Sequence, residues 1–184
     1  MYVGAISMRY SKALLAFANE GNVSNVVYME ALILEQSFKE VLELRHAMEN
    51  PILTQENKMN LLITASGGKV SKQMERFFQL VMKEKREKFL PSIMRSYIDL
   101  YRKQENISVG NLITAVPMAP KEVERIRRII VDHKGGSAEF STKVDPSIQG
   151  GFIFEIGTYR LDASIANQIR KVKQQFIEKN RRIV

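Results

Sequence analysis

The chain has 184 residues, enough for one medium domain or two small ones, and its apolar and charged fractions of 45% and 26% are ordinary for a globular protein. It contains no cysteine, which excludes disulfides, thiolate metal sites and cysteine nucleophiles. Arg9 and Lys12 interrupt the apolar residues of the N-terminus, so neither a signal peptide nor a membrane-spanning helix is expected there.

The formal net charge of +8 is compatible with nucleic acid, an anionic membrane surface or an acidic protein as partner. The basic residues gather in three runs, at 83–88, 125–128 and 170–182. None of the runs is interleaved with aromatic residues as in RNA-binding proteins. A basic nucleic-acid-binding module therefore stays an alternative function, beside the simpler interpretation of a solvated basic surface.

The first half of the chain is predicted to be helical. Apolar residues recur at helical spacing in 4–19, 24–48, 54–65, 71–83 and 89–102. The first and fourth of these segments are apolar over more than one face, which is typical of a helix that lies deep in a bundle or serves a partner.

The pattern changes near residues 104–106. Residues 107–116 are rich in β-branched side chains and predict a strand, 121–133 a helix with inward Val123, Ile126, Ile129 and Ile130, and 137–144 a second strand. A terminal helix is predicted over 164–180. The fold class is mainly α: an N-terminal six-helix bundle over residues 1–105, followed by a small α+β domain of order β-α-β-β-β-α over 106–184.

Turn signals precede the third strand of this second domain. Asp145-Pro146 predicts a turn, because proline fixes φ and the aspartate side chain can accept from backbone N–H groups. Gly150 and Gly151 allow positive φ or a close approach to another segment. They precede a strand, whereas a dinucleotide-binding loop places its glycines between a strand and a helix. A structural turn is therefore favoured over a ligand loop.

A β-hairpin and a helix start follow. Residues 152–156 predict a strand, Gly157 and Thr158 fit a two-residue turn, and 159–161 pair back. Asp162 or Ser164 can cap the terminal helix.

No active site is predicted. His46 and His133 have no metal-ligand spacing around them. Gly68-Lys69 resembles the end of a phosphate-binding loop, but Val70 replaces the required serine or threonine. With no catalytic, metal-binding or cofactor-binding residues, the sequence favours a binding or scaffolding protein.

The whole chain resembles the delta subunit of the bacterial-type ATP synthase, a family that includes the mitochondrial oligomycin-sensitivity-conferring protein. The most specific part is DPSI at 145–148, GGF at 150–152, IG at 156–157 and Asp162-x-Ser164. RYSKAL at 9–14 is similar to the opening motif of the family, with serine in place of the usual alanine at position 11.

The resemblance implies a non-catalytic stator subunit that links the catalytic head to the peripheral stalk and resists rotor torque. The N-terminal domain would bind N-terminal segments of alpha subunits, and the C-terminal domain the C-terminal ends of b subunits. No cofactor and no nucleic acid would be bound. The protein would lie at the cytoplasmic face of a bacterial membrane, which it would contact only through the complex.

The family binds an alpha segment between its first and fifth helices, which correspond here to the two over-apolar segments, 4–19 and 71–83. The expected contact residues are Tyr10, Ala13, Leu14, Phe17, Met74, Phe77, Phe78 and Val81. The alternative is that most of these side chains are bundle core. A second set is expected to be structural: Asp145, Pro146, Gly150, Gly151, Gly157, Asp162 and Ser164.

Overall fold

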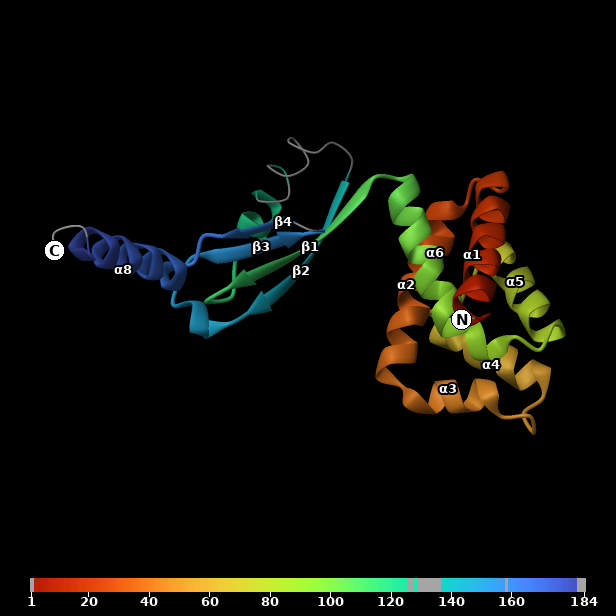
Figure 1. Ribbon diagram of the computed structural model, residues 1–184. Helices are drawn as coiled ribbons and strands as arrows, with labels where there is room; N and C mark the ends of the chain where they lie inside the picture. The colour runs from red at the N-terminus through yellow and green to blue at the C-terminus, as the bar shows by residue number, and fades with distance from the viewer. Residues whose placement is uncertain (1, 126–127, 129–136, 158, 182–184) are drawn as a thin grey trace. The chain divides into compact units, whose positions relative to one another are not determined.

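A computed structural model describes residues 2–125, 128, 137–157 and 159–181 (Figure 1). The chain divides into two compact units, Met1–Gln104 and Glu105–Val184. The predicted fold class is confirmed in both.

Within the described residues, the first unit contains six α-helices and one short 3-10 helix. They are α1 (Tyr2–Glu20), α2 (Ser24–Glu40), α3 (Leu42–Glu49), α4 (Gln55–Ala65), α5 (Lys72–Lys83), η1 (Glu87–Phe89) and α6 (Leu90–Gln104). Helix α6 packs against both α1 and α2 (Figure 1). The largest fully buried side chains of this bundle include Tyr97, Phe38, Phe78 and Leu14.

Small residues let α1 lie close to α6. Ser7, Ser11 and Ala18 form the buried face of α1 together with Leu14. The Ser11 hydroxyl lies 2.8 Å from the carbonyl oxygen of Ile93 on α6 and 2.7 Å from that of Ser7. Ser11, which stands in place of the usual alanine of the family, therefore finds two carbonyl acceptors for its hydroxyl where α1 and α6 lie close together.

The prediction of one helix over 24–48 is wrong. Val41 is extended, with φ −113° and ψ 95°, and separates α2 from α3. The break exposes the carbonyl oxygen of Phe38, which accepts a hydrogen bond from Arg45 Nε at 2.8 Å. In the sequence, Val41 and Leu42 continue the apolar spacing of α2, but in the structure they are 45% and 59% exposed. The sequence pattern therefore does not reveal the break.

The second unit is a mixed four-stranded sheet followed by a helix. Its elements are β1 (Ile107–Thr114), β2 (Ser137–Val144), the short 3-10 helix η2 (Pro146–Ile148), β3 (Phe152–Ile156), β4 (Tyr159–Asp162) and α8 (Ile165–Arg181). The strand order is β2-β1-β3-β4, with β1 and β2 parallel and the other pairs antiparallel. A parallel pair needs a long crossover connection, which residues 115–136 supply.

Two predicted elements of this unit differ in extent from those in the structure. The first strand was expected to reach residue 116, but Ala115 and Val116 form a bend. Of the helix expected over 121–133, the described residues 121–125 and 128 are helical, and the helix begins one residue earlier, at position 120. Ile126, Ile129, Ile130 and His133 lie outside the described residues.

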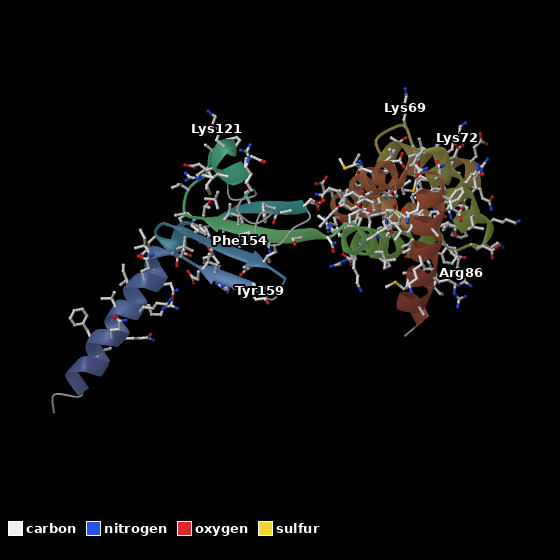
Figure 2. All side chains as sticks on the ribbon, turned by 90° about the horizontal axis from the view of Figure 1, so that it is seen from above. Lys69, Lys72, Arg86, Lys121, Phe154 and Tyr159 are labelled. Carbon is white, nitrogen blue, oxygen red and sulfur yellow. The ribbon has the colours of Figure 1, made fainter. Side chains whose placement is uncertain are left out.

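An apolar core cluster of the second unit lies on one face of the sheet. Leu112 on β1 pairs with Phe154 on β3, and Gly110 pairs with Ile156. Partly buried Met118, Phe140 and Phe152 pack against this cluster. The rings of Phe140 and Phe154 meet edge to face, with centroids 5.3 Å apart (Phe154 is labelled in Figure 2).

Gly150 and Gly151 allow the segment that leads into β3 to lie in close contact with the start of α8. Gly150 and Gly151 have φ of 145° and 74°. A Cβ on Gly151 would lie 2.3 Å from the carbonyl oxygen of Ala163, and one on Gly150 would lie 2.6 Å from Ile165 Cδ1. In this close contact the N–H of Ile165 donates to the carbonyl oxygen of Gly150 at 3.0 Å. This geometry fits the structural turn predicted from the sequence.

Candidate functional site

Helices α1 and α5 meet along an apolar seam. The ring of Tyr10 on α1 meets the ring of Phe77 on α5 nearly at right angles, with centroids 6.4 Å apart. Gly21, just after α1, lies close to the side chain of Gln73 near the start of α5. The seam therefore extends along α1 from its end to its middle and along the first two turns of α5, from Gln73 to Phe77.

One stripe of α1 borders this seam without being fully buried. Ile6, Tyr10, Ala13 and Phe17 recur at i, i+4, i+7 and i+11, so they share a helix face. Ala13 is exposed, whereas Ile6, Tyr10 and Phe17 are half-buried. This stripe lies beside the buried face that holds Leu14, so apolar surface continues from the core to the solvent.

The structure brings the two groups of expected contact residues together but places five of the eight in the core. Leu14, Met74, Phe77, Phe78 and Val81 are between 0% and 4% exposed. An aspartate at position 14 would place a carboxylate in the core, so that substitution would report on folding instead of on binding.

Two apolar residues beside the seam were not among the expected contacts. Ile6 is half-buried on the α1 stripe, and Leu80 on α5 is 46% exposed. Leu80 follows Phe77 by three residues, so helical spacing places it on the neighbouring part of the surface. Helical spacing in the sequence points to both residues, but it does not distinguish apolar residues buried in the core from those that stay at the surface.

Helix α8 carries the second apolar surface. Ile165, Ile169, Val172 and Phe176 share one face, as predicted, and are between 44% and 65% exposed. Arg170, Lys171 and Lys173 on the same helix are also exposed. An exposed apolar stripe next to basic side chains is typical of a helix that packs against a partner.

Ser164 caps α8, and the Asp162 carboxylate accepts hydrogen bonds from Ser164. The hydroxyl oxygen of Ser164 accepts from the N–H of Asn167 at 3.2 Å, while its N–H donates to Asp162 Oδ1 at 3.1 Å. Hydrogen bonds from the Ser164 hydroxyl and N–H lower the pKa of Asp162, helped by nearby Arg160. Asp145 is equivalent at η2, where the hydroxyl and N–H of Ser147 lower its pKa. Asp145 therefore stabilises the turn before η2, and Asp162 and Ser164 stabilise the turn before α8.

The part of the chain that the structure describes shows no cluster of three His, Cys, Asp or Glu side chains that could hold a metal ion. His46 lies exposed in the last turn of α3. Over the same residues, no helix is both long and apolar enough to cross a membrane. The basic side chains of Lys69, Lys72 and Arg86 lie on the outside of the helical unit (Figure 2).

A protein-family model described as "ATP synthase delta (OSCP) subunit" matches residues 6–176. The chain belongs to this family. The ATP synthase subunit delta of Phocaeicola vulgatus is 59% identical over the full length of both chains, and that of Bacteroides fragilis is 50% identical, also over the full length of both. The ATP synthase subunit delta of Prochlorococcus marinus is 31% identical over 92% of this chain and 95% of its own.

Membership in the delta family makes this chain a non-catalytic stator subunit of the F-type ATP synthase. The fold agrees. One chain in the cryo-EM structure of the Toxoplasma gondii mitochondrial ATP synthase hexamer aligns with a TM-score of 0.65, covering 93% of this chain and 97% of that chain. At 19% identity this likeness concerns the fold alone.

Proposed function

We propose that this stator subunit joins the catalytic head to the peripheral stalk through its two units. The first unit binds N-terminal segments of alpha subunits, and the second binds the C-terminal ends of b subunits. The subunit thereby holds the head still against rotor torque. It acts at the cytoplasmic face of the bacterial membrane, and its contact with the membrane is indirect, through the complex.

The proposed binding of alpha segments by the first unit is supported by the accessible apolar stripe of α1 beside α5. Tyr10, Ala13 and Phe17 present apolar surface, and Tyr10 is braced by Phe77 beneath it. An amphipathic helix can pack its apolar face against such a stripe. Leu14, Met74, Phe78 and Val81 are buried in the core of α1 and α5, so they support these helices and do not contact the partner directly.

The test introduces a charge into the stripe without disturbing the core. Ala13→Glu keeps a good helix former at an exposed position, so the fold should be unchanged. Calorimetry with a synthetic peptide of the alpha N-terminus should show at least about tenfold weaker binding, since one desolvated carboxylate costs more than about 1.4 kcal/mol. Ala16→Glu, at another exposed position of α1, is the matched control. Equal affinities for both variants would contradict the assignment of the stripe.

The second contact is supported by α8. Its apolar stripe and its basic side chains fit a partner helix that offers both apolar and acidic residues. Reversing the charges of Arg170 and Lys173 to glutamate should slow association with a fragment that carries the C-terminal end of b, because long-range attraction steers the encounter at low salt. An association rate that does not change at low salt would argue against this role.

Nucleic acid is not proposed as a partner. If the basic surface served nucleic acid, binding would fall steeply with salt. Purification of the chain from detergent-solubilised membranes should instead recover subunits of the catalytic head. Recovery of nucleic acid without those subunits would overturn the proposed function.

A further inference from the structure

A groove separates the outer surfaces of α2 and α6, which lie side by side (Figure 1). It contains two adjoining cavities with volumes of about 450 and about 240 Å³. Both cavities are lined by Glu35, Lys39 and Arg95, so they form one continuous depression. The groove does not involve α1 or α5 and is therefore a different surface from the seam described above.

Cations outnumber anions in this groove. Its lining includes four basic side chains and two carboxylates: Lys39, Arg45, Arg95 and Arg102, against Glu35 and Asp99. Lys39 Nζ lies 2.7 Å from a carboxylate oxygen of Glu35, so these two charges largely offset each other. The three arginines then stand against the single carboxylate of Asp99, which leaves the groove positive.

Two of the arginines are held in place by their Nε atoms. Arg102 Nε donates to the Tyr28 hydroxyl at 2.9 Å, and its guanidinium lies over the Tyr28 ring, 5.9 Å from the centroid. Tyr28 is itself stacked on Tyr101, with centroids 4.3 Å apart. At the other end of the groove, Arg45 Nε donates to the carbonyl oxygen of Phe38 at 2.8 Å. Fixed guanidinium groups lose little freedom when they bind carboxylates.

Arg95 lies between these two ends, because it lines both cavities. It is exposed, and within the described residues it has neither a hydrogen bond nor an ion pair. A planar guanidinium without a partner between two fixed ones is suited to a two-pronged contact with a carboxylate.

The groove also has apolar walls and a defined length. Leu32 and Pro91 are half-buried and supply its accessible apolar surface, whereas Phe38 and Ile98, which also line the cavities, are only 1% and 4% exposed. From Pro91 to Arg102, α6 rises about 16 Å, which corresponds to about three turns of a bound helix. An occupant would therefore need apolar side chains on one side and carboxylates on the edges.

We propose that the α2–α6 groove binds an acidic amphipathic helical segment of another subunit of the ATP synthase. Arg95 pairs with a carboxylate in the middle of the segment, and Arg45 and Arg102 hold its two ends. This assignment does not depend on which segment occupies the α1–α5 seam, so the two proposals can fail separately.

Because the chain contains no cysteine, a single introduced thiol gives one defined attachment point. Gln36→Cys places it at an exposed position in the groove lining. A benzophenone attached there, in purified ATP synthase, should crosslink to a segment of another subunit that is rich in Asp and Glu, identified by mass spectrometry. The absence of a crosslink, or a crosslink to a segment without surplus carboxylates, overturns the proposal.

A charge reversal then tests the role of Arg95. Adding Arg95→Glu to the Gln36→Cys chain should lower the crosslink yield about tenfold, because a repulsive contact replaces an attractive one. Lys69→Glu is the control, at an exposed position between α4 and α5 that lines neither the groove nor the seam, and it should leave the yield unchanged. An equal yield in both variants overturns the proposal, as does crosslinking to nucleic acid in place of protein.

Discussion

Glu30 on α2 accepts two hydrogen bonds from Ser71, the residue that immediately precedes α5. One carboxylate oxygen of Glu30 accepts the N–H of Ser71, and the other accepts its hydroxyl at 2.8 Å. The same hydroxyl oxygen accepts the N–H of Met74 at 3.3 Å and so caps α5. Glu30 is 7% exposed, so its hydrogen bonds form a buried link between α2 and the start of α5. Glu30 and Ser71 are 41 residues apart in the sequence.

We expect Glu30→Ala to lower the free energy of unfolding by about 2 kcal/mol. The substitution leaves the N–H of Ser71 without its acceptor and removes a hydrogen bond to a charged group. Urea denaturation followed by circular dichroism measures the change. Glu20→Ala, at an exposed position, should stay within about 0.5 kcal/mol of the wild-type chain. Equal losses in both variants would show that the Glu30–Ser71 link contributes nothing specific.

Lys58 is the second buried polar link of the bundle. Its Nζ donates to the carbonyl oxygen of Met48 at 2.9 Å and lies 3.3 Å from a carboxylate oxygen of Glu87, with both side chains nearly buried. Lys58→Met should cost about 3 kcal/mol, because it leaves the carboxylate of Glu87 without its partner.

A double-mutant cycle separates this effect from simple loss of packing. The double variant Lys58→Met, Glu87→Gln should cost at least about 1 kcal/mol less than the sum of the two single variants. The free energies come from the same denaturation experiment. Strictly additive costs would mean that the two side chains do not interact.

Gly151 and Gly157 provide a matched pair in the second unit. Both have positive φ, 74° and 58°, but a Cβ would collide with the carbonyl oxygen of Ala163 only at Gly151, whereas it meets nothing within 4 Å at Gly157. Gly157→Ala should therefore cost about 1 kcal/mol from backbone conformation alone. Gly151→Ala should cost more than about 2 kcal/mol, since the entry of β3 must move away from the start of α8.

Hydrogen exchange of the β3 and α8 amides locates the damage. Faster exchange confined to these elements is expected for Gly151→Ala, with the helical unit unchanged. If both glycine variants are equally stable, the close contact between β3 and α8 is not what requires glycine at position 151.

The pKa of Asp162 reports on its hydrogen bonds from Ser164. Because folding lowers this pKa, the contribution of Asp162 to stability is present at neutral pH and is lost as the pH falls through the carboxyl range. Ser164→Ala should move the pKa of Asp162 back toward its ordinary value, measured by carbon NMR titration of the carboxyl groups.

Asp145 supplies the control for this titration. Ser147→Ala removes the corresponding hydroxyl from Asp145 and should raise the pKa of Asp145 alone. If Ser147→Ala shifts both carboxyl groups, or if Ser164→Ala shifts neither, the serine hydroxyls are not the cause of the lowered values.

Local patterns in the sequence were enough to predict the family, the fold class and most element positions. These patterns are short-range: helical periodicity, β-branched runs, and turn residues such as Asp145-Pro146 and Gly157. Strands 137–144 and 152–156 were predicted with the bounds that the structure gives them. Ser164 was one of two candidates for the cap of α8, and the structure selects it by the hydrogen bond from Asn167.

The division of the apolar residues into core and surface came from helix packing alone. Leu14 and Phe17 belong to the same apolar sequence pattern, yet one is 1% exposed and the other half-buried, because α6 covers one face of α1 and leaves the next face open. The α2–α6 groove has the same origin. Lys39 and Arg45 precede Arg95 by at least 50 residues in the sequence, and only the packing of α2 and α3 against α6 brings the three charges to one surface.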